Sequence, residues 1–194
     1  MGQQLMQTAA AKTPAAQAAA AELQQYLTFL SGGEMYGLAI LNVKEIIEYG
    51  SLTEIPMMPA FIRGVINLRG AVVPVVDLLA RFGGKQTEVG RRTCIVIVEM
   101  ENDEGRQDIG VVVDAVSEVL EIADGDIEPP PAFGARIRTD FINGMGKVAG
   151  KFVILLNIQR VLSAEEMALL AHAGDGGQSG ESAAALESAA PQRP

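Results

Sequence analysis

The side chains that could carry out nucleophilic chemistry are few and poorly placed. Nucleophilic catalysis needs a Ser, Cys or Thr beside a base, and the single histidine, His172, lies where a glycine- and serine-rich stretch begins. The single cysteine, Cys94, lies inside an apolar stretch, where a thiol is a core residue rather than a reactive one. We therefore expect both side chains to be bystanders.

Carboxylates are the remaining candidates for acid–base or metal chemistry. Asp77 and Asp114 each end an apolar run, which suits a turn or capping role, and a hydrolase that uses both is the alternative. The acidic turn 101–104 lacks the twelve-residue pattern of a calcium loop. No glycine-rich phosphate loop leads into a helix. These patterns predict a protein that is not an enzyme and that needs no cofactor or metal.

Composition excludes further classes of function. The chain has 15 Lys and Arg against 24 Asp and Glu, a net charge of −9, whereas nucleic-acid binding needs clustered basic residues. One cysteine excludes an intrachain disulfide and fits a reducing compartment. The sequence shows neither a signal-peptide pattern nor an apolar run long enough to cross a bilayer. We expect a cytoplasmic protein without membrane insertion.

Two stretches that lie far apart in the chain predict the same β-hairpin. The first, 61–78, is FIRGVINLRGAVVPVVDL, with Arg69 at the tip of its polar turn; the second, 141–158, is FINGMGKVAGKFVILLNI. Upstream, the segments 36–48 and 109–121 align without gaps and share residues at several positions, including Gly37 with Gly110 and Glu45 with Glu118. Two matched blocks in the same order predict two copies of one β unit.

The remaining strands are short and nearly evenly spaced, which is typical of small β-barrels. The segment 43–48 fits either a strand or a helical turn, and 92–100 is an apolar strand. Ser163 and Glu166 have the spacing of a capping box and predict a short helix. The predicted divisions are a disordered arm at 1–21, a folded body at 22–171 and a disordered tail at 172–194. Within the body we expect subdomains at about 22–88 and 91–160, followed by a C-terminal helix at 163–171.

Several side chains suit contact with a partner rather than chemistry. Arg69 can be a solvated tip residue, half of a local ion pair, or an exposed anchor, a role that Arg often has. Val43 and Ile46 flank Glu45, a pattern that fits amphipathic packing or a contact surface. The sequence leaves these alternatives open.

From about Gln25 to Leu170 the sequence resembles the CheW family, the coupling proteins of bacterial chemotaxis. The motifs that carry the resemblance are YGLAILNVKEI, PAFIRGVINLRGAVVPVVDL, IGVVVDAVSEVL and SAEEMALL. The resemblance implies an all-β fold of two intertwined five-stranded SH3-like β-barrels with a short C-terminal helix. It also implies a scaffold that joins the tip of a chemoreceptor to the C-terminal regulatory domain of the histidine kinase CheA, with further CheW copies in rings.

The resemblance implies sites as well as partners. Receptor binding would use Val43, Glu45, Ile46 and Arg69, in arrays at the inner face of the membrane. Kinase docking would use the surface of subdomain 1, without assigned residues. The arm and the tail are not family hallmarks, and neither a receiver domain nor a kinase core is present, which argues against the relatives CheV and CheA.

A different class of function remains as an alternative. A small barrel could bind a small molecule or single-stranded nucleic acid, which would require aromatic platforms and a basic groove. An aromatic content of 5% and a net charge of −9 make this the weaker interpretation.

Overall fold

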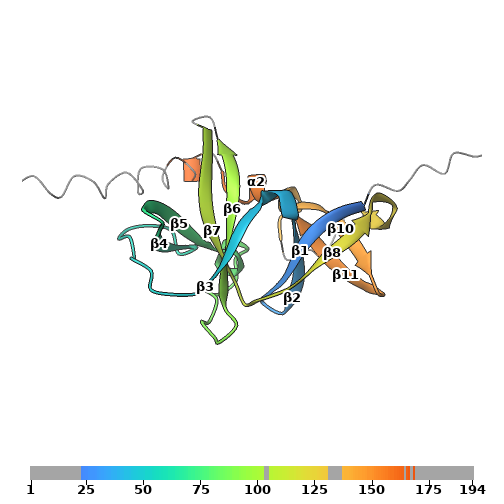
Figure 1. The fold of residues 1–194 in the computed structure, drawn as a ribbon, viewed down its shortest axis with the longest axis horizontal. Coiled ribbons are helices and arrows are strands. Elements are labelled where there is room, and N and C mark those ends of the chain that lie inside the picture. The colour runs from blue at the N-terminus through green and yellow to red at the C-terminus, as the bar shows by residue number, and fades with distance from the viewer. Residues whose placement is uncertain (1–22, 103–104, 131–136, 164, 167, 169–194) are drawn as a thin grey trace, which may run out of the picture.

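The computed structural model describes residues 23–102, 105–130, 137–163, 165–166 and 168 (Figure 1). The expected arm at 1–21 and tail at 172–194 lie outside these residues. The described residues form eleven strands and two short α-helices. The strands are β1 (Leu23–Ser31), β2 (Glu34–Ala39), β3 (Val43–Glu48), β4 (Ile62–Leu68), β5 (Ala71–Asp77), β6 (Cys94–Asn102), β7 (Gly105–Val113), β8 (Ala115–Ala123), β9 (Ile127–Glu128), β10 (Ile142–Val148) and β11 (Lys151–Leu156). The helices are α1 (Leu78–Arg81) and α2 (Ile158–Val161), and 3-10 turns lie at Ile40–Asn42, Asp124–Asp126 and Thr139–Phe141.

The strands form two sheets, which lie at opposite ends of the molecule in Figure 1. One has the order β3-β6-β7-β5-β4, and the other the order β8-β1-β2-β11-β10-β9. The segment 43–48, for which the sequence allowed two conformations, is a strand. The predicted fold class is confirmed, since the structure is dominated by strands in two sheets.

The two matched hairpins have the same register. In β4–β5, Ile66 pairs with Val73; at the equivalent place in β10–β11, Gly146 pairs with Val153. Both hairpins shift register at the same place, after their first residue pair. Both turns have two residues with positive φ, Arg69 and Gly70 in one and Ala149 and Gly150 in the other. This is the twist that a two-residue hairpin loop requires.

Each hairpin pairs with a strand of the other unit. β5 runs parallel to β7, with Val75 opposite Gly110, and β11 runs parallel to β2, with Leu155 opposite Gly37. A Cβ atom at either glycine would meet a packed side chain at less than 3.0 Å. The two glycines, which the upstream sequence match aligns with each other, therefore hold the same structural position, where two strands approach closely.

The strands that complete each sheet also pair across the two repeat units. β3 pairs with β6 and β8 pairs with β1. The chain after β3 reaches β4 through one bridge, Thr53 with Val65, and the chain after β8 reaches β10 through β9. Each sheet thus closes on itself. The first sheet uses chain from 43 to 113, and the second uses 23–39 with 115–156.

The sheets therefore divide the chain differently from the expected subdomains. A boundary near 88–91 falls within the sheet of β3–β7, because β6 and β7 join the hairpin β4–β5 there. The repeat units are sequential, whereas the barrels are built by exchange between them.

The core has three parts. One apolar cluster fills each barrel, around Val75 and Ile97 in one and around Tyr26 and Leu155 in the other. The largest cluster joins the barrels and includes side chains from both sheets, among them Phe29, Val98 and Phe141. Because the barrels share this cluster, we expect them to unfold together.

The first hairpin ends slightly earlier than the predicted stretch, and the predicted capping box is present. The predicted stretch 61–78 runs one residue beyond β5, which ends at Asp77; Asp77 caps α1 by accepting a hydrogen bond from the Ala80 amide at 3.2 Å. The capping box is confirmed: the Ser163 amide donates to Glu166 at 2.7 Å, and the Glu166 amide donates to Ser163 Oγ at 3.2 Å. Of the predicted helix 163–171, only residues 163, 165, 166 and 168 are described.

Candidate interaction surface

The tip of the first hairpin forms a bidentate ion pair with β3. Arg69 donates from Nη1 to Glu45 Oε1 at 2.9 Å and from Nη2 to Glu45 Oε2 at 2.8 Å. The hairpin loop holds Arg69 at φ 53°, and Asn67 Oδ1 fixes the loop by accepting from the Gly70 amide at 2.9 Å. The Arg69 side chain is 78% exposed and that of Glu45 is 25% exposed. Two of the predicted site residues, which belong to different elements, are thus in direct contact.

The other two predicted residues lie on the opposite face of β3. A register shift between Val43 and Glu45 turns Val43 away from the acid. Ile46 pairs with Val96 and so lies on the face that carries the cluster shared by the barrels. Ile46 is 44% exposed there, and Val43 packs against that cluster. The four residues therefore form a charged patch on one face of β3 and an apolar patch on the other, rather than one continuous surface.

A shallow groove of about 390 Å³ runs beside the ion pair. Lys44 closes one side with bonds to Asp108 at 2.6 Å and to Glu99 at 2.8 Å. These hydrogen bonds, the one to Asp108 first, raise the pKa of Lys44, and the bond from Lys44 lowers the pKa of Glu99. Lys44 and Glu99 therefore stay charged near neutral pH. The groove presents fixed charges over an apolar base that includes Leu68.

Apolar exposure repeats between the two units. Ile46 and its equivalent in the second unit, Val119, are 44% and 47% exposed. Val72 and its equivalent in the second hairpin, Phe152, are 40% and 51% exposed. Four apolar side chains at equivalent positions give both barrels similar contact surfaces.

The carboxylates considered for hydrolysis have structural roles. Asp77 is fully buried and accepts from the Thr87 amide at 2.7 Å, from Thr87 Oγ1 at 3.0 Å and from Arg63 at 3.4 Å. Asp114 accepts from the Gly32 amide at 2.8 Å in a turn. Because the donors around Asp77 occupy it and solvent does not reach it, the arrangement does not support a hydrolase.

The remaining candidates for chemistry also lack a site. Cys94 was expected in the core; at the first residue of β6 it is half-buried and packs against the shared cluster, and its Sγ contacts the Arg92 carbonyl at 3.1 Å. His172 and residues 103–104 of the acidic turn lie outside the described residues. Within the part of the chain that the structure describes, no cluster of His, Cys, Asp or Glu could hold a metal ion. No helix in that part is long and apolar enough to cross a bilayer.

The sequence reasoning missed Arg63, which organises a second polar cluster. Its side chain is only 14% exposed and contacts Asp77 across the hairpin. The available signal was an arginine within an apolar strand of a hairpin that ends with an aspartate.

Comparisons with known proteins identify the family. Residues 25–166 match the family model described as a CheW-like domain. The chain is 38% identical to the chemotaxis protein CheW of Klebsiella aerogenes over 76% of this chain and 86% of the relative. It is 34% identical to the chemotaxis protein CheW of Rhizobium meliloti, over 74% and 90%, and 33% identical to protein FrzA of Myxococcus xanthus, over 72% and 85%.

A solved structure agrees with the sequence matches. The crystal structure of the scaffolding protein TtCheW from Thermoanaerobacter tengcongensis superposes with a TM-score of 0.68 at 37% identity, over 76% of this chain and 94% of that one. Family model, relatives and fold all cover the body that contains the Glu45–Arg69 pair. The chain therefore belongs to the CheW family of chemotaxis scaffold proteins.

Proposed function

We propose that this protein couples chemoreceptor tips to the histidine kinase CheA and so lets receptors control kinase activity. The observation that carries the proposal is the CheW-like match over residues 25–166. In this role the protein catalyses no reaction and requires rigid binding surfaces. Closed barrels with a shared apolar core would provide such surfaces.

Receptor binding is assigned to Val43, Glu45, Ile46 and Arg69. The ion pair holds the exposed Arg69 guanidinium in one orientation, which lowers the entropy that binding would cost. The receptor tip is a helical hairpin in this family, and an apolar stripe on a helix would fit the exposed Ile46.

Kinase docking is assigned to the surface of subdomain 1, about 22–88. The CheA regulatory domain has a related fold in this family, so barrel-to-barrel contacts can recur between kinase and scaffold and between scaffold copies. The exposed Val72 supports this proposal, because it offers an apolar contact within this range; its equivalent, Phe152, gives the other barrel a similar contact for pairing between copies. Weak individual contacts would suffice, since an array raises their effective concentration. The protein would act in the cytoplasm at receptor arrays.

The experiment is a calorimetric titration of this protein with the C-terminal regulatory domain of CheA from the same cell. We expect saturable one-to-one binding with a micromolar or tighter Kd. No heat of binding with a folded sample, against every CheA of that genome, would reject the kinase partner.

A further inference from the structure

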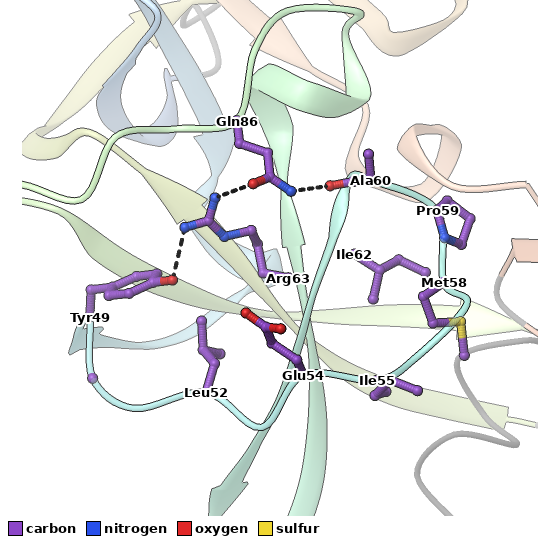
Figure 2. Close-up of a pocket in the computed structure, with 11 residues that line it drawn as sticks. Tyr49, Leu52, Glu54, Ile55, Met58, Pro59, Ala60, Ile62, Arg63 and Gln86 are labelled. Atoms are coloured by element: carbon purple, nitrogen blue, oxygen red, sulfur yellow. Dashed lines mark hydrogen bonds between the residues drawn. The ribbon is translucent and has the colours of Figure 1, made fainter.

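A second pocket, of about 410 Å³, opens where the barrel of β3–β7 closes (Figure 2). The barrel is closed there by one bridge, in which Thr53 and Val65 exchange backbone hydrogen bonds of 2.9 and 2.8 Å. The segment between β3 and β4 forms most of the wall. Its apolar lining comes from Leu52, Ile55, Met58 and Ile62, and its polar lining includes Tyr49, Glu54, Arg63 and Gln86.

The positive charge of Arg63 is already compensated. Its Nη1 contacts the buried Asp77 at 3.4 Å, Gln86 Oε1 at 3.2 Å and the Thr87 carbonyl at 3.4 Å. Its Nη2 donates to the Tyr49 hydroxyl at 3.0 Å. With a neutralised charge and 14% exposure, this guanidinium is poorly suited to capture an anion.

The charge of Glu54, in contrast, is not compensated by another residue of the described chain. The residue is exposed, and among the described residues it has neither a hydrogen-bond nor an ion-pair partner. Figure 2 shows its carboxylate pointing into the pocket, on the side of Arg63 and Tyr49. Since Arg63 and Glu54 are the charged residues of the lining, the pocket carries an uncompensated negative charge.

We propose that this pocket binds an arginine or lysine side chain of a partner protein. Leu52, Ile55 and Met58, which are partly exposed in an otherwise mostly polar lining, would contact the aliphatic stem, while its charged end stays near water. The Glu54 carboxylate would accept charge-assisted hydrogen bonds from the cationic end. The net charge of −9 favours the approach of a basic partner.

The pocket also distinguishes the two barrels. At the positions equivalent to Arg63 and Asp77, the second hairpin has Asn143 and Asn157, so the ion pair that shapes the pocket is absent from the other barrel. A basic side chain that enters this pocket would therefore select one barrel of two that otherwise resemble each other. Selectivity of this kind goes beyond the proposed coupling role and does not depend on which partner carries the basic residue.

The test is an NMR titration of the full chain with n-butylguanidinium chloride and, separately, sodium butyrate, at constant ionic strength. We expect saturable shifts of the Gln86 side-chain amide and the Gly50 backbone amide with butylguanidinium but not with butyrate. Glu54→Gln should weaken butylguanidinium binding at least tenfold. Glu88→Gln, the same change at an exposed residue outside the lining, should leave it unchanged.

Three results would overturn the proposal. They are no saturable shift with butylguanidinium, saturable shifts with butyrate instead, and equal weakening by both variants, which would mean a general charge effect. Because the kinase titration is a separate measurement, each proposal can fail without the other.

Discussion

At the scale of single residues, the first hairpin uses two arginines in different ways. Arg69 is exposed at the tip and is held by Glu45, whereas Arg63 is nearly buried and holds Asp77. An exposed pair contributes little to stability, about 0.2–1 kcal/mol. Loss of one partner of a buried pair costs far more, because the other charge stays buried. The first pair is therefore available for binding and the second is needed for folding.

Arg69→Glu should weaken receptor binding and leave the fold intact. The change puts a carboxylate beside Glu45 and removes the exposed cation, and we expect a loss of affinity of at least tenfold for a receptor-tip fragment. The measurement is a binding titration together with a thermal melt. Arg91→Glu, at an exposed arginine outside the groove, is the control.

The charge-swapped double variant Glu45→Arg, Arg69→Glu separates two explanations. Recovery of binding would mean that the pair acts by fixing the loop; continued loss would mean that the partner contacts Arg69 itself. Unchanged affinity in a folded Arg69→Glu variant would contradict the assignment of this residue.

Asp77→Ala should lower the free energy of unfolding by about 3–5 kcal/mol. The substitution leaves Arg63 without its ion-pair partner and removes the acceptor of the Thr87 amide. Urea denaturation measures the change. Asn157→Ala at the equivalent position should cost less than about 1 kcal/mol, because Asn157 makes no side-chain cap bond. Equal effects at the two positions would refute the structural role of Asp77.

The sequence led to a set of proposed receptor-binding residues but not to the contacts between them. It singled out Arg69, Glu45, Ile46 and Val43, and it left an ion pair open as one alternative for Arg69. It did not identify Glu45 as the partner, because the pairing depends on how the hairpin tip folds over β3 and not on local spacing.

At the scale of elements, the hairpins were predicted well and their endings were not. The constant alignment of the two stretches and the glycine in each turn predicted the shared register, since a two-residue loop fixes the pairing of its strands. α1 and α2 were missed, because each is too short for a helical pattern to appear in the sequence. A turn or capping role for Asp77 was predicted, but the bonds that it accepts from Thr87 and Arg63 were not, because they depend on tertiary contacts.

Gly64→Ala should destabilise the protein by about 2–5 kcal/mol. Gly64 has φ 139°, and a Cβ atom there would collide with the Thr53 carbonyl, the group that closes the barrel. Gly70→Ala in the same hairpin should cost only about 1–2 kcal/mol, because φ is positive but the space is open. Thermal and urea denaturation of both variants measure the difference, and similar losses at the two sites would contradict it.

At the scale of the whole molecule, the sequence predicted the duplication. The duplication alone, however, did not show that the two units exchange strands. Matched blocks establish two units, but they do not specify whether each hairpin pairs with its own unit or with the other. Val75 opposite Gly110 and Leu155 opposite Gly37 answer this in the structure. The resemblance to CheW had implied intertwined barrels, which the two sheets agree with.

The fragment 92–171 should not fold alone. It contains β8, β10 and β11 but lacks β1 and β2, with which β8 and β11 pair. It also contains β6 and β7 without the hairpin that completes their sheet. Circular dichroism should show no cooperative melt. A soluble fragment with a sharp transition would contradict the exchange.

The account rests on coupling, and one reconstitution tests it most directly. CheA autophosphorylation is measured with receptor-containing membranes, with and without this protein, before and after addition of a receptor ligand. We predict that the ligand changes kinase activity only when this protein is present, and that Arg69→Glu removes most of that change. Kinase activity that responds to the ligand equally well without the protein, or that ignores the ligand when all components are folded and bound, would contradict the coupling role.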